Sequence, residues 1–222
     1  MSIIRDNCIF IHIPKCAGTS MEKAFGRDCL GHAHQTVQEM VTMGLDEFGN
    51  EYDINLPILC FVRNPYDRLI SSFCYRFYTH KFYHKCEYGA HPRVLRTTRP
   101  LTAIAFEEFI RNVDSVDDMS PPELMNPFRT QFSFVSKDGK LAATHIYRFE
   151  NLYQDFRTMA DEFFPSYKDI SLPHENRTEV RLAQVENRRG WKSFFKNKEV
   201  KDKVDELYRI DFNTFNYPMV IQ

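Results

Sequence analysis

Short apolar runs, each closed by polar residues, mark three buried strands along the chain. Cys8–Ile13 (CIFIHI) ends at Pro14, and Leu56–Val62 (LPILCFV) ends immediately before Arg63. Runs of this length are typical of strands that are buried on both faces of a parallel sheet. A third strand is predicted over Thr144–Phe149. The pattern therefore indicates a sheet that needs helices on its faces.

Helical patterns follow the strands. Thr19–Phe25 is predicted as a helix after the first strand, and Asp67 is a candidate N-cap for an aromatic helix over roughly Arg68–Phe82. Three more helices are expected, over Phe106–Val113, Asn151–Phe164 and about Glu199–Phe212. Strands that alternate with helices predict an α/β fold, with a central parallel sheet flanked by helices and ligand-binding loops at the carboxyl ends of the strands.

The chain length of 222 residues suits one domain over residues 1–222. His80–Pro100 departs from the pattern because it is rich in Lys, Arg and His and shows no period, so we predict a basic insertion there. The aromatic side chains of Trp191, Phe194 and Phe195 are expected to pack against the sheet.

Composition limits the partners and the compartment that we expect. A formal net charge of −1 provides no general attraction to nucleic acid. No stretch approaches the roughly 18 apolar residues that span a membrane, and the first residues do not resemble a signal peptide. Six cysteines without close pairing are expected to stay reduced. We therefore expect a cytoplasmic protein with no membrane span and no nucleic acid partner, and its oligomeric state stays open.

The first candidate site is the loop Pro14–Ser20 (PKCAGTS), which joins the first strand to a helix. Small residues let backbone N–H groups approach an anion, and the amino end of the helix adds partial positive charge. Lys15 supplies a full charge, while Thr19 and Ser20 supply hydroxyl donors. The loop is not a Walker A motif, since its Lys precedes the only Gly by three residues.

The second candidate site is Phe61–Phe73 (FVRNPYDRLISSF), which again joins a buried strand to a helix. Arg63 stands at the end of the strand, where its planar guanidinium can bind a phosphate. Ser71 lies eight residues later, near the start of the helix. Two anion sites in this order, about 45 residues apart, are more specific than either alone.

Together the two segments resemble the nucleotide-binding loops of sulfotransferases of the carbohydrate (Golgi-type, sulfotransferase family 2-like) branch. The resemblance continues more faintly through Arg148–Leu152, Leu172–Asn176 and Tyr208–Tyr217, so it covers most of the chain. It implies a P-loop-like nucleotide-binding fold and a transferase. The implied donor is 3′-phosphoadenosine-5′-phosphosulfate (PAPS), and no metal is required.

The resemblance also implies roles for individual residues. Lys15 would contact the oxygen that bridges phosphate and sulfur. Arg63 and Ser71 would bind the 3′-phosphate of the nucleotide. The 5′-phosphosulfate would be held by the loop residues Lys15, Cys16, Ala17, Gly18, Thr19 and Ser20.

Transfer to a hydroxyl by in-line displacement also needs a base that takes the proton. Relatives that sulfate sugar 2-hydroxyls use a His in a short segment between the two loops, and Gly31–Thr36 (GHAHQT) occupies that place. His34 is the best match and His32 is the reserve. Glu22, on the helix after the first loop, is the carboxylate alternative.

Several alternatives stay open at this point. A carbohydrate acceptor follows from the resemblance alone, so a tyrosine or small-molecule hydroxyl remains possible. A nucleotide-dependent kinase would usually need an acidic residue at a strand end to hold Mg²⁺, and none follows an apolar strand here. A non-catalytic nucleotide-binding module is the other rival.

His80, His84 and Cys86 have no fourth ligand at a familiar spacing, so no zinc site is expected.

Overall fold

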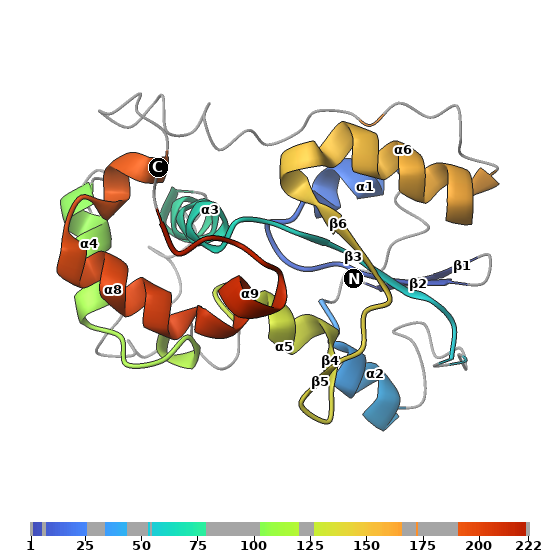
Figure 1. The fold of residues 1–222 in the computed structure, drawn as a ribbon, viewed down its shortest axis with the longest axis horizontal. Helices are drawn as coiled ribbons and strands as arrows, with labels where there is room; N and C mark the ends of the chain where they lie inside the picture. Colours follow the sequence, from blue (N-terminus) through green and yellow to red (C-terminus); the bar gives the residue numbers. More distant parts are fainter. Residues whose placement is uncertain are drawn as a thin grey trace, which may run out of the picture. The chain divides into compact units, whose positions relative to one another are not determined.

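The computed structural model describes residues 2–5, 8–25, 34–43, 53, 55–78, 103–119, 127–165, 172 and 191–220. The basic stretch His80–Pro100 lies outside these residues. The chain divides into two compact units (Figure 1), which are Met1–Arg63 with Gln131–Glu175 and Asn64–Thr130 with Asn176–Gln222.

The first unit is built on a four-stranded sheet with the order β1-β2-β3-β6. Its strands are β1 (Ser2–Arg5), β2 (Cys8–Ile11), β3 (Ile58–Val62) and β6 (His145–Arg148). The last three are parallel neighbours, as the apolar runs predict, and β1 is antiparallel to β2 at the edge. The prediction of a parallel sheet is therefore confirmed, while β1 was not predicted from the sequence.

The middle strand β3 carries the core of the first unit. Every side chain of β2 and β3 is buried, which explains why their sequences show no polar alternation. The Phe61 ring lies 6.4 Å from that of Phe10 and 5.4 Å from that of Tyr147, measured between ring centroids. These rings join β3 to β2 and β6. The packing holds the end of β3 in place, and Arg63 is the residue that directly follows it.

Helices cover the sheet as predicted (Figure 1). Helix α1 (Gly18–Phe25) meets α6 (Leu152–Phe163) through Phe25, whose ring centroid lies 5.7 Å from that of Phe156. Contacts also join α2 (Val37–Met43) to α5 (Gln131–Val135) and to the hairpin of β4 (Ser136–Lys137) and β5 (Lys140–Leu141).

A tight turn closes the β4–β5 hairpin. Its two central residues, Asp138 and Gly139, have positive φ values of 51° and 73°. A type I′ turn requires this conformation at both positions, and Asp-Gly is among the pairs that adopt it most readily. The backbone N–H of Asp138 donates to Oε1 of Gln38 at 2.9 Å, so the turn is fixed to α2.

The described part of the second unit is helical. Its elements are α3 (Pro65–Tyr78), α4 (Ala103–Arg111), η3 (Asp117–Met119), η6 (Trp191–Phe195), α8 (Lys198–Leu207) and α9 (Arg209–Thr214). The Trp191 ring stacks on Tyr66 of α3, and Phe194 and Phe195 pack against Phe106 of α4. These η6 side chains therefore pack on helices of their own unit, and the expected packing against the sheet stays a prediction.

Helix α3 begins three residues earlier than predicted. Its N-cap is Asn64, whose Oδ1 accepts hydrogen bonds from the N–H groups of Tyr66 at 3.0 Å and Asp67 at 3.4 Å. Pro65 occupies the first helical position, where its fixed φ suits the helix and its missing N–H costs nothing. The prediction of Asp67 as the N-cap is therefore wrong, because Asp67 lies inside the first turn.

The predicted last helix is two helices, α8 and α9, which meet at Tyr208. Tyr208 has φ −112° and ψ 15°, outside the helical region, and its hydroxyl donates to the carbonyl of Phe128 at 2.7 Å. This hydrogen bond joins residues far apart in the sequence. The break depends on tertiary structure, which the local helical pattern does not reveal.

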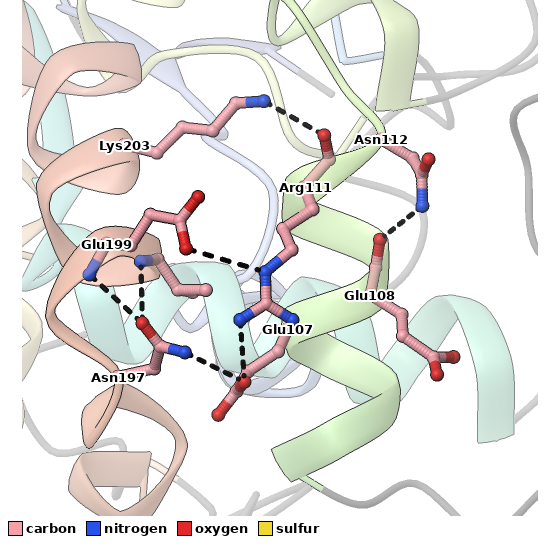
Figure 2. Close-up of polar contacts among 8 residues, drawn as sticks. Glu107, Glu108, Arg111, Asn112, Asn197, Glu199 and Lys203 are labelled. Atoms are coloured by element: carbon pink, nitrogen blue, oxygen red, sulfur yellow. Dashed lines mark hydrogen bonds and ion pairs between the residues drawn. The ribbon is translucent and has the colours of Figure 1, made fainter.

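A polar network fixes the start of α8 to α4 (Figure 2). The N-cap Asn197 accepts from the N–H groups of Glu199 and Val200 and donates through Nδ2 to Oε2 of Glu107 at 3.2 Å. The same Glu107 oxygen accepts from Nη2 of Arg111 at 3.2 Å. One side chain therefore caps a helix and also joins it to its neighbour.

Candidate functional site

The loop between β2 and α1 has an unusual backbone. Lys15 and Ala17 have φ values of 68° and 67°, in the left-handed region that non-glycine residues rarely adopt. Each such residue costs of order 1–3 kcal/mol, so surrounding contacts must hold it in place. Left-handed residues in tight loops form nests, in which successive N–H groups face an anion. The two left-handed residues are compatible with a nest, and the binding of an anion by this loop stays a prediction.

Helix α1 begins directly from this loop. The carbonyl of Ala17 accepts from the N–H groups of Ser20 at 2.9 Å and Met21 at 3.1 Å, which makes Ala17 the N-cap. The first N–H groups of an α-helix have no partner inside the helix, and the helix dipole favours negative charge there. Ser20 is buried, and the Thr19 side chain lies outside the described residues.

Gly18, the first residue of α1, lies against the ring of His12. A Cβ atom at Gly18 would lie 1.5 Å from Nε2 of His12, far inside van der Waals contact. The glycine is therefore required because no other residue leaves room for this ring. Sequence reasoning missed His12, although it is the only polar residue in the run Cys8–Ile13.

His12 is buried directly after β2. Burial lowers the pKa of its imidazole well below 6.5, and the neighbouring His34 lowers this pKa further. His12 is therefore neutral at physiological pH. Within the described part of the chain its Nδ1 atom has no hydrogen-bond partner, which a charged ring could not tolerate.

The candidate base His34 lies beside His12. Its Nδ1 is 3.1 Å from the carbonyl oxygen of His12, and the two ring centroids are 4.4 Å apart. Because a carbonyl oxygen can only accept, Nδ1 of His34 must carry the hydrogen, and Nε2 carries the lone pair in the neutral ring. His12 thus connects His34 to Gly18 of the loop.

The segment that carries His34 is fixed by a capping box. Oγ1 of Thr36 accepts from the N–H of Glu39 at 3.1 Å, and Oε2 of Glu39 accepts from the N–H of Thr36 at 2.8 Å. This pair caps α2, which begins at Val37, three residues after His34. The other two candidates for the base, His32 and the side chain of Glu22, lie outside the described residues.

Arg63 is brought to the loop by the end of β3. Its Nη1 donates to the carbonyl of Lys15 at 3.2 Å, and its Cζ lies 4.0 Å from the ring centroid of Phe149. Phe149 directly follows β6, the strand beside β3, and a guanidinium over an aromatic face is a stabilising arrangement. The structure therefore brings the predicted residues Lys15 and Arg63 together.

Gln131, which no sequence motif indicated, contacts residues of both loops. Its side chain is fully buried, and its Nε2 donates to the carbonyl of Arg63 at 2.8 Å. Its Oε1 accepts from the N–H of Arg63 at 2.8 Å and from Sγ of Cys16 at 3.3 Å. A polar residue at the start of α5 offers no signal of these distant contacts.

Ser71 belongs to the second unit, where it is buried on α3. Arg63 belongs to the first unit, so joint binding of a 3′-phosphate by Arg63 and Ser71 stays a prediction. The other arginine of the motif, Arg68, has a structural role because it donates to the carbonyls of Arg129 at 2.8 Å and Pro127 at 3.2 Å.

No group of His, Cys, Asp or Glu suited to a metal ion is found in the described ranges, and His84 and Cys86 lie outside them. Within the same ranges no helix has the length and apolar character needed to cross a bilayer. Four cysteines in the described part form no disulfide bond, namely Cys8, Cys16, Cys60 and Cys74.

Residues 4–218 match the family model described as "Sulfotransferase family", which covers nearly the whole chain. The chain therefore belongs to the sulfotransferase family, and its α/β fold with a parallel sheet agrees with this assignment. It is a transferase of the class that moves sulfuryl groups. Searches of curated proteins and of solved structures found no match.

The contact between Gly18 and His12 makes a direct prediction. Gly18→Ala should lower the free energy of unfolding by about 1–3 kcal/mol, because the new methyl group overlaps a buried ring. Urea unfolding followed by circular dichroism measures this loss. The double variant Gly18→Ala/His12→Ala should be more stable than Gly18→Ala alone. Costs that simply add would show that the two residues do not interact in this way.

The lowered pKa of His12 predicts how stability changes with pH. Above pH 6.5 the ring is neutral in both states, so it contributes no pH dependence. Below pH 6.5 the unfolded chain binds a proton that the folded protein excludes, so stability falls by about 1.4 kcal/mol per pH unit. Unfolding curves from pH 7.5 to 5 should show a steeper loss for the wild type than for His12→Leu. Parallel curves would contradict the assignment.

Proposed function

We propose that the protein transfers the sulfuryl group of PAPS to a hydroxyl, with a carbohydrate as the favoured acceptor. The loop between β2 and α1 carries this proposal, because left-handed Lys15 and Ala17 precede a helix that must start with glycine. Such a cradle in a member of the sulfotransferase family fits a 5′-phosphosulfate. The carbohydrate acceptor is supported by the sequence resemblance, and a tyrosine or small-molecule hydroxyl is the alternative.

Several residues of the chain fit the charges of this donor. When bound, PAPS supplies an activated sulfuryl group, whose bond to the phosphate oxygen breaks as the acceptor oxygen bonds to sulfur. The Lys15 ammonium stabilises negative charge that develops on the departing phosphate. The remainder of the cradle consists of Cys16, Ala17, Gly18, Thr19 and Ser20. For the 3′-phosphate, Arg63 supplies positive charge and Ser71 supplies a hydroxyl donor.

His34 takes the proton of the acceptor hydroxyl. Its Nδ1–H is directed at the His12 carbonyl, so the proton is accepted at Nε2. His12 itself is unsuited to this task, because burial lowers its pKa and so disfavours the charged imidazolium that a base becomes when it accepts a proton. The hydrogen bond to the carbonyl also stabilises the imidazolium form of His34 after the proton has moved.

Nucleotide binding tests the donor assignment. The desulfated product, 3′-phosphoadenosine-5′-phosphate, should raise the melting temperature, since at 100 times its Kd a ligand stabilises the native state by about 2.7 kcal/mol. AMP should raise it far less, because it lacks the 3′-phosphate assigned to Arg63 and Ser71. Equal shifts would argue against that assignment. Transfer from ATP with Mg²⁺, but not from PAPS, would instead indicate a kinase, and binding without any transfer would indicate a non-catalytic module.

Turnover of three variants tests the base. His34→Ala should reduce kcat by about 10²- to 10⁴-fold, the usual contribution of a positioned base, with nucleotide affinity unchanged. His32→Ala and Glu22→Gln are measured in the same assay, and we expect smaller losses from both. A larger loss in either variant would transfer the role of the base to that residue. Full activity in all three would favour an acidic acceptor, such as a phenol, that needs little help.

A further inference from the structure

Gln131 replaces a neighbouring strand at the end of β3. The β3–β6 ladder ends where Val62 pairs with Arg148, and Arg63 is the next residue. There the Gln131 amide accepts from the N–H of Arg63 and donates to its carbonyl, both at 2.8 Å. The side chain makes the two hydrogen bonds that an adjacent strand would make, so it fixes the backbone of Arg63 beyond the sheet.

The same amide also reaches the first loop. Its Oε1 accepts from Sγ of Cys16 at 3.3 Å, and Cys16 stands between the two left-handed residues Lys15 and Ala17. A strained loop needs contacts that oppose its relaxation. Gln131 supplies one from a fully buried position, where polar contacts are least exposed to competition from water.

These contacts form a closed ring. Gln131 holds the backbone of Arg63, the Arg63 guanidinium donates to the carbonyl of Lys15, and the next residue, Cys16, donates back to Gln131. We propose that Gln131 is a positioning residue that sets Lys15 and Arg63 in register, so that both loops bind one nucleotide together. This inference depends on the proposed function, because it assigns the two loops to the same donor.

The chemistry of the site explains why glutamine is required. The position needs an acceptor for two donors and, on the same planar group, a donor for the Arg63 carbonyl. Glutamate lacks the donor and would add a buried charge. Asparagine is shorter by one methylene group, and methionine has a similar volume but no N–H or amide oxygen. Gln131→Met therefore removes the hydrogen bonds and largely preserves the packing.

The chain offers a matched control at the other end of β3. Oγ1 of Thr144 accepts from the N–H of Ile58 at 2.9 Å and lies 3.2 Å from the carbonyl of Ile58, where it can donate. This side chain also pairs with both backbone groups of one β3 residue, but it touches neither loop. Thr144→Val removes a comparable pair of side-chain contacts to the backbone of β3. It therefore measures the effect of losing such contacts on the fold, without a change at either loop.

The experiment compares the dissociation constants of AMP and 3′-phosphoadenosine-5′-phosphate by calorimetry, well below the melting temperature of each variant. In the wild type the dissociation constant of AMP divided by that of 3′-phosphoadenosine-5′-phosphate measures how much the 3′-phosphate contributes to binding. A smaller ratio means a smaller contribution. Gln131→Met should reduce this ratio at least tenfold and lower kcat, while Thr144→Val should retain both. A general loss of stability would not change the ratio in protein that remains folded.

A second variant decides the matter if Gln131→Met does not fold. Cys16→Ala removes the thiol contact and leaves the two bonds to Arg63, so it should reduce the ratio about two- to threefold. A wild-type ratio in every folded variant would overturn the role of Gln131 and leave the proposed function intact. A wild type that binds the two nucleotides equally would instead contradict the assignment of the 3′-phosphate site itself.

Discussion

The approach of the His12 ring to Gly18 is the constraint on which the first unit depends. The ring leaves no space for a side chain at the start of α1, so the helix begins close to the end of β2. The loop that connects them is short, and Lys15 and Ala17 in it are left-handed. The same histidine presents its carbonyl to His34. His12 thus contacts the start of α1 through its ring and the candidate base through its backbone carbonyl.

Local sequence patterns predicted the parts of the fold that local chemistry determines. The three parallel strands follow from uninterrupted apolar runs, because residues such as Phe61 are buried on both faces of the sheet. The loop after β2 follows from a glycine and a lysine between a strand and a helix. The helix start was predicted at Asp67, but Pro65 is favoured at the first helical position and so makes Asn64 the N-cap.

Features that depend on distant contacts could not be predicted in this way. The hydroxyl of Tyr208 reaches the carbonyl of Phe128, and the helix breaks there although the surrounding sequence has a helical pattern. His12 and Gln131 acquire their roles from partners that only the folded chain brings near. A neutral buried histidine and a buried glutamine follow no motif, so sequence reasoning predicted charged residues such as Lys15 and Arg63 and missed the buried side chains that contact this part of the chain.

The Gln131–Arg63 pair also has a consequence for chain entropy. The chain leaves the first unit after Arg63 and returns to it at Gln131, and hydrogen bonds join these two residues directly. The whole segment Asn64–Thr130 is therefore a loop whose ends are tied together at its base. Closing such a loop becomes only about 0.6 kcal/mol more costly for each doubling of its length. The number of residues between Arg63 and Gln131 therefore adds little to the entropic cost of bringing these two residues together.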